Sequence, residues 1–169
     1  GWYSGSLLAQ DAEAEIAALQ PHLALLKALG STVFVFAETS NAVHGNRGVA
    51  LSDTPRLPAA GWAEFGRRLT QVADYVQSHG IKFAYHHHLG TVVERGEDLD
   101  AFIAHTGPSV GLTVDTGHAA LGGIQIGVHT DGRDAFLHQL EGYVPGGQLF
   151  QRAEDDRVVG HDELTAPGH

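Results

Sequence analysis

Regular alternation between helical and strand-like segments is the feature that most constrains the fold of this chain. Three short runs rich in β-branched and aromatic residues, at 31–38, 81–86 and 110–115, each follow a segment whose apolar residues have helical spacing. Parallel neighbours need such crossover helices, whereas antiparallel neighbours do not. We therefore predict an α/β fold with a parallel sheet that is covered by helices.

One helical segment and one loop carry further signals. Residues 11–29 begin with Asp11, a good N-cap residue, and are followed by a glycine that suits the end of a helix. Pro21 lies inside this segment and predicts either a kink or the start of a second short helix. Residues 41–58 are polar and predict a long loop, and long loops often have functional roles.

Composition excludes several classes of protein. The formal net charge is −10, and nucleic acid is not an expected partner because its binding depends on cationic contacts with phosphate. No apolar run approaches the ~20 residues of a membrane span. The chain has no cysteine, which excludes disulfides, zinc–thiolate sites and cysteine nucleophiles. Its 12 histidines, together with carboxylates, indicate metal binding through nitrogen and oxygen.

Polar residues follow the carboxyl end of each predicted strand, where ligands bind in parallel α/β sheets. They are Glu38, the run His86-His87-His88, and Asp115 with His118. Alternation along each strand predicts that His86, His88 and Asp115 point inward, and that His87 points outward. Each has a plainer alternative: Asp115 as a helix cap, the histidines as incidental surface residues, and Glu38 as a solvated loop residue.

Four sequence stretches resemble one family of enzymes. They are GWYSG at 1–5, FVFAETSNAVHG at 34–45, YHHHLGTVVE at 85–94 and LTVDTGHAALGG at 112–123. This combination is similar to the myo-inosose-2 dehydratases of inositol catabolism, within the xylose isomerase-like barrels of sugar isomerases and epimerases. The resemblance implies a partial (β/α)8 TIM barrel that contains about strands three to six.

Length and composition divide the chain in two. A complete eight-stranded barrel needs about 250 residues, and this chain has 169, begins with Gly1-Trp2 and contains no Met, so we expect a fragment or a processed piece. The partial barrel is predicted for residues 1–123. Residues 124–169 contain eight acidic and three basic residues, no convincing buried strand, and room for one helix at 134–144. They predict a divergent tail, or translation in a shifted frame, and leave open whether the tail is ordered.

The resemblance also implies a function. It implies a cytoplasmic, metal-dependent hydro-lyase that removes water from 2-keto-myo-inositol (scyllo-inosose), with Mn²⁺ or Co²⁺ as the cofactor. The implied roles are metal binding by His86 and Asp115, substrate contact by His118 and His44, and proton transfer by Glu38 or His88. The strand-five ligand of the broader group is commonly a glutamate, so His88 is an alternative ligand to His86.

Two alternative functions remain open. One is a sugar isomerase or epimerase of the same barrel group, and the other is an inactive truncated fragment. For the dehydratase and for the isomerase or epimerase alike, the expected partner is a small polyol or keto-inositol, with no nucleic acid and no membrane. Because a partial barrel has unpaired strand edges, we also predict that the chain forms homo-oligomers or aggregates.

Overall fold

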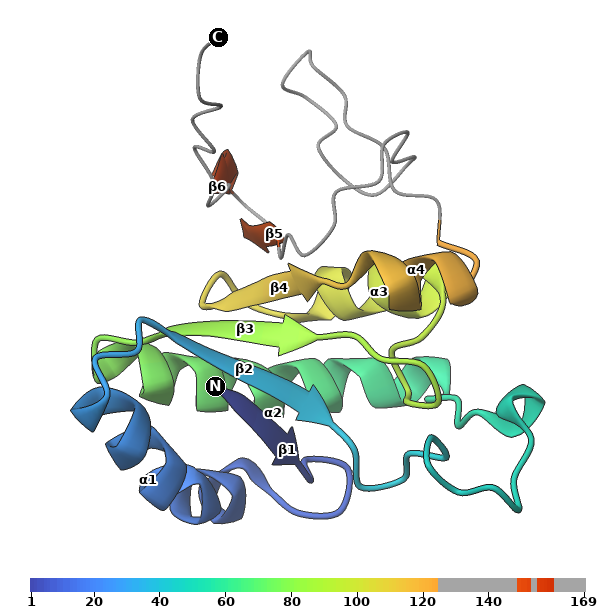
Figure 1. Cartoon of the computed structure of the whole chain (residues 1–169), viewed down its shortest axis with the longest axis horizontal. Helices are drawn as coiled ribbons and strands as arrows, with labels where there is room; N and C mark the ends of the chain where they lie inside the picture. The colour runs from blue at the N-terminus through green and yellow to red at the C-terminus, as the bar shows by residue number, and fades with distance from the viewer. Residues whose placement is uncertain (125–148, 153–154, 160–169) are drawn as a thin grey trace, which may run out of the picture.

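A six-stranded sheet organises the computed structural model, which describes residues 1–124, 149–152 and 155–159 (Figure 1). The strands are β1 (Trp2–Gly5), β2 (Val33–Glu38), β3 (Lys82–His86), β4 (Val110–Val114), β5 (Leu149–Arg152) and β6 (Asp155–Val159). They are hydrogen-bonded in that order, and β1 to β4 run parallel. The predicted α/β fold with a parallel sheet is confirmed.

Helices connect the parallel strands and form the crossovers that the alternation predicted. They are α1 (Ala12–Ala28), α2 (Ala59–Ser78) and α3 (Gly96–His105). The described residues also contain α4 (Thr116–Leu121), which follows β4, and a 3-10 turn at Leu51–Asp53. Figure 1 shows α2 running along the sheet behind β2 and β3. In the described part of the chain, no helix combines the length and apolar character that crossing a membrane requires.

The first helix, α1, continues through Pro21 as one element. Asp11 caps it, and the Asp11 side chain accepts a hydrogen bond from the amide of Ala14 at 2.9 Å. Leu19 and Leu23 are buried on either side of the proline, which is itself exposed. The prediction of a second short helix is therefore wrong, because buried anchors on both sides hold a single helix across the missing amide.

The two faces of the sheet differ in character. Aromatic rings occupy the face that the helices cover; they are Tyr3, Phe34, Phe36, Phe83 and Tyr85. Tyr85 packs against Phe65 of α2 and Phe102 of α3, with ring centroids 6.3 and 4.5 Å apart. The opposite face carries small and polar residues on β3 and β4, among them Ala84 paired with Gly111, and His86 paired with Thr113. Trp2 lies on this face, with its ring centroid 4.9 Å from that of His86.

Strands β5 and β6 lie in the part of the chain where the sequence predicted no buried strand. β5 pairs antiparallel with β4, and β6 pairs antiparallel with β5. Short strands with several charged residues, such as DDRVV in β6, have little apolar periodicity to reveal them. The helix predicted at 134–144 lies outside the described residues, and the division of the chain near residue 123 stays a prediction.

Candidate metal and substrate site

Three of the predicted site residues meet at the carboxyl ends of β3 and β4. His86 ends β3, Asp115 follows β4, and His118 lies three residues further on in α4. Their ligand atoms all lie within 4.8 Å of one another. Asp115 Oδ2 is 3.8 Å from His86 Nε2 and 4.0 Å from His118 Nε2. Bonds from nitrogen or oxygen ligands to a divalent metal ion such as zinc are about 2.0–2.2 Å long, so two ligand atoms of one ion lie up to about 4.4 Å apart. The two separations from Asp115 therefore fit a single divalent ion.

Asp115 uses its two carboxylate oxygens differently. Oδ1 accepts hydrogen bonds from the amides of Gly117 at 2.9 Å and His118 at 3.0 Å, and so caps α4. Oδ2 faces the imidazoles of His86 and His118. Partial burial alone would raise the pKa of Asp115, but the His118 amide and the nearby imidazoles outweigh it and leave that pKa lowered. Capping and metal binding are therefore compatible, because they use different oxygens.

Hydrogen bonding determines which ring nitrogen of His86 carries the proton. Its Nδ1 lies 2.7 Å from the carbonyl oxygen of His87. A carbonyl can only accept, so Nδ1 donates and Nε2 presents its lone pair toward Asp115. Burial lowers the pKa of His86, although the hydrogen bond and the Asp115 carboxylate oppose it, and burial also lowers the pKa of His118. Neutral imidazoles are the form that binds a metal.

Two further histidines extend the cluster on the side of His118. The ring centroid of His88 lies 3.8 Å from that of His118 and 4.4 Å from that of His44. His88 Nδ1 lies 2.8 Å from the carbonyl oxygen of Leu89, so Nδ1 is the donor, and in the neutral ring Nε2 carries the lone pair. Burial, and then the neighbouring His88, lower the pKa of His44. The structure thus brings together His44, His86, His88, Asp115 and His118.

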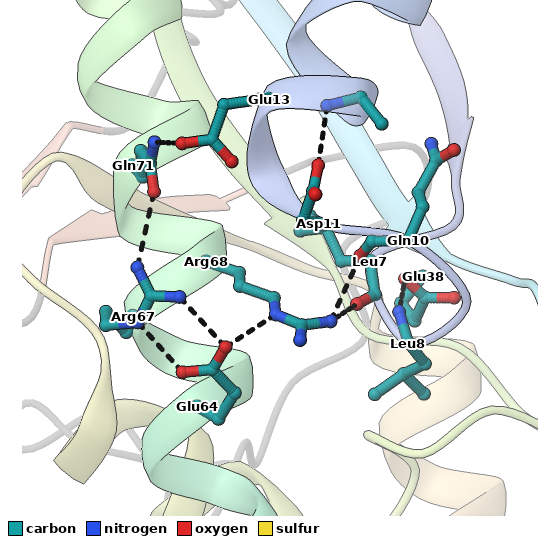
Figure 2. Close-up of polar contacts among 11 residues, drawn as sticks. Leu7, Leu8, Gln10, Asp11, Glu13, Glu38, Glu64, Arg67, Arg68 and Gln71 are labelled. Atoms are coloured by element: carbon teal, nitrogen blue, oxygen red, sulfur yellow. Dashed lines mark hydrogen bonds and ion pairs between the residues drawn. The ribbon is translucent and has the colours of Figure 1, made fainter.

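Glu38 is the predicted site residue that does not join this cluster. It shares the helix-facing side of β2 with Phe34 and Phe36 and has no exposed surface. Its Oε2 accepts from the amide of Leu8 at 3.3 Å (Figure 2), and its Oε1 accepts from the amide of Ser40 at 2.8 Å. Burial raises the pKa of Glu38, although these hydrogen bonds oppose it. The interpretation as a solvated loop residue is wrong, and a catalytic role for Glu38 stays a prediction.

His87 makes a contact that the sequence did not indicate. It is buried, and its Nε2 accepts a hydrogen bond from the backbone amide of Asp115 at 3.2 Å. The outward orientation that alternation predicted for this ring stays a prediction. Burial, followed by the neighbouring His86, lowers the pKa of His87 to about 4, so the ring is neutral near pH 7 and can accept this bond. The contact joins residues 28 positions apart, and no local periodicity predicts it.

Comparisons with known proteins agree with this architecture. A model of the xylose isomerase-like TIM barrel family matches residues 1–161. Rhizopine catabolism protein MocC from Rhizobium meliloti is 42% identical over 123 residues, which are 73% of this chain and 38% of that protein. Inosose dehydratases from Mesomycoplasma hyopneumoniae and Lactiplantibacillus plantarum are 32% and 31% identical, over 74% and 71% of this chain and 42% and 41% of those proteins. The chain spans about two-fifths of the length of these curated relatives.

A solved structure has the same fold. It is a xylose isomerase-like TIM barrel protein from Mycobacterium smegmatis in complex with magnesium, with a TM-score of 0.53 and 19% identity. The likeness covers 70% of this chain and 41% of that one, in agreement with a partial barrel. The predicted resemblance to inosose dehydratases is confirmed by the relatives that carry this name. Because the family model matches residues 1–161 of this chain, the chain belongs to the xylose isomerase-like TIM barrel family.

Proposed function

We propose that this chain provides the divalent-metal site of a dehydratase that converts 2-keto-myo-inositol (scyllo-inosose) to a trihydroxycyclohexane-1,2-dione. The observation that carries the proposal is the group formed by His86, Asp115 and His118, with His88 in the adjoining ring, whose Nδ1 bonds to the carbonyl of Leu89. The relatives named inosose dehydratase support the substrate class. As an enzyme of inositol catabolism, it would work in the cytoplasm on a small polyol ketone.

His86 and Asp115 would bind the metal, and His118 would border both the metal and the substrate. The Nε2 of His118 faces Asp115 while its ring packs against His88, so His118 is also a candidate third ligand. Imidazole and carboxylate ligands without thiolates suit Mn²⁺ or Co²⁺. When bound, the ion polarises the ketone oxygen and makes the neighbouring C–H group more acidic.

Dehydration also requires a base at the α-carbon and a proton for the departing β-hydroxyl group. His88 takes the α-proton on its Nε2, and then donates a proton to the β-hydroxyl oxygen, which leaves as water. His44 and His118 both pack against His88 and would contact the hydroxyl groups of the substrate. Glu38 is the weaker candidate for proton transfer, because its carboxylate is occupied by Leu8 and Ser40.

The test is turnover of scyllo-inosose with added Mn²⁺ or Co²⁺. We would assay the chain itself and a chimera in which its residues 1–123 replace the matching segment of the Lactiplantibacillus plantarum inosose dehydratase. The expected result is metal-dependent formation of the dione by the chimera. His86→Ala and His88→Ala should each lower the rate at least ~100-fold, the scale of losing a ligand or a proton-transfer group. A folded chimera that binds metal but forms no dione contradicts the proposal.

A second candidate substrate comes from the 42% identity to a rhizopine catabolism protein. The family also keeps open a sugar isomerase or epimerase that uses the same metal-binding residues. Parallel assays with scyllo-inosose, a rhizopine and a ketohexose distinguish these functions. Dehydration of the inosose in preference to the other two is the result that the proposed function requires.

A further inference from the structure

Two loops carry the histidines that extend the cluster beyond the metal-binding group. Residues 39–58, between β2 and α2, carry His44, and residues 87–95, between β3 and α3, carry His88. The two rings lie 4.4 Å apart, although they come from different loops. Ordering a long loop loses conformational entropy. A fixed His44 ring therefore requires specific contacts that tie its loop to the rest of the site.

The buried carboxylate of Glu94 supplies such contacts. Its side chain is only 9% exposed. Glu94 Oε2 accepts hydrogen bonds from the hydroxyl of Thr54 at 2.9 Å and from the amide of Gly90 at 2.5 Å. Arg95 Nη2 lies 3.2 Å from the other oxygen, Oε1. One carboxylate oxygen therefore binds both loops at once, and its negative charge is partly neutralised by a neighbouring guanidinium.

The loops also touch directly beside His44. The amide of Val43 donates to the carbonyl of Gly90 at 2.8 Å. Gly90 has a φ of +74°, and a Cβ atom there would lie 2.7 Å from the backbone nitrogen of His44. Glycine is thus required for this close approach. Because Glu94 binds the amide of the same Gly90, two consecutive hydrogen bonds connect its carboxylate to the backbone next to His44.

We propose that Glu94 is a positioning residue that holds His44 against His88. Its significance for catalysis rests on the proposed function, in which these two histidines act on the substrate, but the placement of the rings does not. An exposed ion pair offers a matched control, since Arg56 of the first loop lies 2.6 Å from Glu97 of α3. Exposed pairs of this kind contribute little, so Glu97 should not be needed for the placement.

The experiment compares Glu94→Ala, Glu94→Gln and Glu97→Ala in the full chain. The readouts are the ring NMR signals of His44 and His88 and the hydrogen exchange of the Gly90 amide. In Glu94→Ala we expect the mutual ring-current shifts to disappear and exchange of Gly90 to accelerate roughly 10-fold or more, the scale of one lost charge-assisted hydrogen bond. Glu94→Gln keeps an acceptor oxygen and should restore both signals, while Glu97→Ala should match the parent. Unchanged His44 signals in Glu94→Ala, or equal changes in Glu97→Ala, overturn the proposal.

Faster hydrogen exchange of the Phe83 amide in β3 would reveal that Glu94→Ala unfolds the chain. In that case a second variant tests the proposal. Thr54→Val removes the hydroxyl that links Glu94 to the first loop and leaves the Glu94 carboxylate in place. It should accelerate exchange of Val43 and alter the His44 ring signals while the amide of Phe83 stays protected. Unchanged Val43 and His44 in this variant overturn the proposal. None of these readouts requires substrate, so a failed dehydratase assay would reject the proposed function and leave this test intact.

Discussion

Two carboxylates lie at the carboxyl ends of strands in the same sheet, Glu38 as the last residue of β2 and Asp115 directly after β4, yet their environments are opposite. The side chain of Asp115 is 38% exposed, and backbone amides and imidazoles keep its pKa lowered. Glu38 has no exposed surface, faces the helices, and has a pKa that burial raises. A position at the end of a strand is therefore not enough to make a carboxylate a ligand. The face of the strand and the supply of donors decide whether it can reach an external ion.

The largest expected effect is on metal affinity. Asp115→Asn should weaken Mn²⁺ binding by at least about 100-fold, because the neutral amide cannot offset the charge of a dication and a direct ligand contributes at least as much as its supporting residues. Thermal stability should change little, since asparagine caps a helix about as well as aspartate. Isothermal titration calorimetry and thermal unfolding measure the two effects. If Asp115→Asn binds Mn²⁺ as tightly as the parent, Asp115 is a helix cap and not a metal ligand.

The next effect concerns His87, whose Nε2 accepts a hydrogen bond from the backbone amide of Asp115. His87→Ala should lower the free energy of unfolding by about 2–3 kcal/mol, because it leaves a cavity and removes the acceptor for the amide of Asp115. It should also weaken Mn²⁺ binding about 10-fold, the scale of a lost supporting contact. His87→Gln can still accept this hydrogen bond and should recover part of both losses. Chemical denaturation and calorimetry give both numbers, and equal behaviour of the two variants would mean that the contact is passive packing.

Acidification should change the free energy of unfolding in opposite directions through His87 and through Glu38. His87 has a pKa of about 4 when folded and near 6.5 when unfolded, so the unfolded chain binds more protons between these values. The free energy of unfolding of the metal-free protein should therefore fall, by about 1–2 kcal/mol between pH 7 and pH 5. The raised pKa of Glu38 acts in the opposite direction, because the folded state binds its proton more readily than the unfolded chain.

Urea denaturation at several pH values tests this dependence. His87→Gln should flatten the profile, because it removes the histidine that prefers to be neutral in the folded state. Glu38→Gln should steepen the loss, since it removes the group whose folded state gains protons on acidification. A profile that rises between pH 7 and pH 5 would show that the buried carboxylate outweighs the histidines.

The smallest expected effect belongs to the buried carboxylate itself. Glu38→Gln should cost about 1 kcal/mol of stability, because the amide nitrogen cannot accept a hydrogen bond and one of the two backbone donors, that of Leu8 or that of Ser40, loses its partner. Its Mn²⁺ affinity should equal that of the parent. Thermal unfolding and metal titration on one preparation provide the comparison, and a large loss of affinity would place Glu38 in the metal site after all.

Local periodicity explains how much of the fold and of the site could be predicted. The strands at 31–38, 81–86 and 110–115 are visible in the sequence because apolar residues with strand propensity are consecutive there. Alternation placed His86 and Asp115 on one face, and the structure brings them to 3.8 Å. The same rule applied to VFVFAE puts Glu38 on the side of Phe34 and Phe36, so its separation from the histidines was also predictable.

Contacts between loops could not be predicted in this way. Thr54 and Glu94 meet across 40 positions of sequence, and the hydrogen bond from Asp115 to His87 crosses 28. Such contacts depend on how each loop leaves its strand, which no repeating pattern encodes. The short strands β5 and β6 escaped detection for a related reason, since their pairing with β4 and with each other is not visible in either segment alone.

The indole of Trp2 gives the metal-binding group an optical reporter. Its ring lies against His86 on the face of the sheet that carries the site, whereas the chain's other tryptophan, Trp62, is buried on α2. Transition-metal ions quench the fluorescence of a nearby indole. Cobalt bound beside His86 should therefore dim the emission of Trp2 and leave that of Trp62 nearly unchanged, so that occupancy of the site can be followed without a label and without substrate.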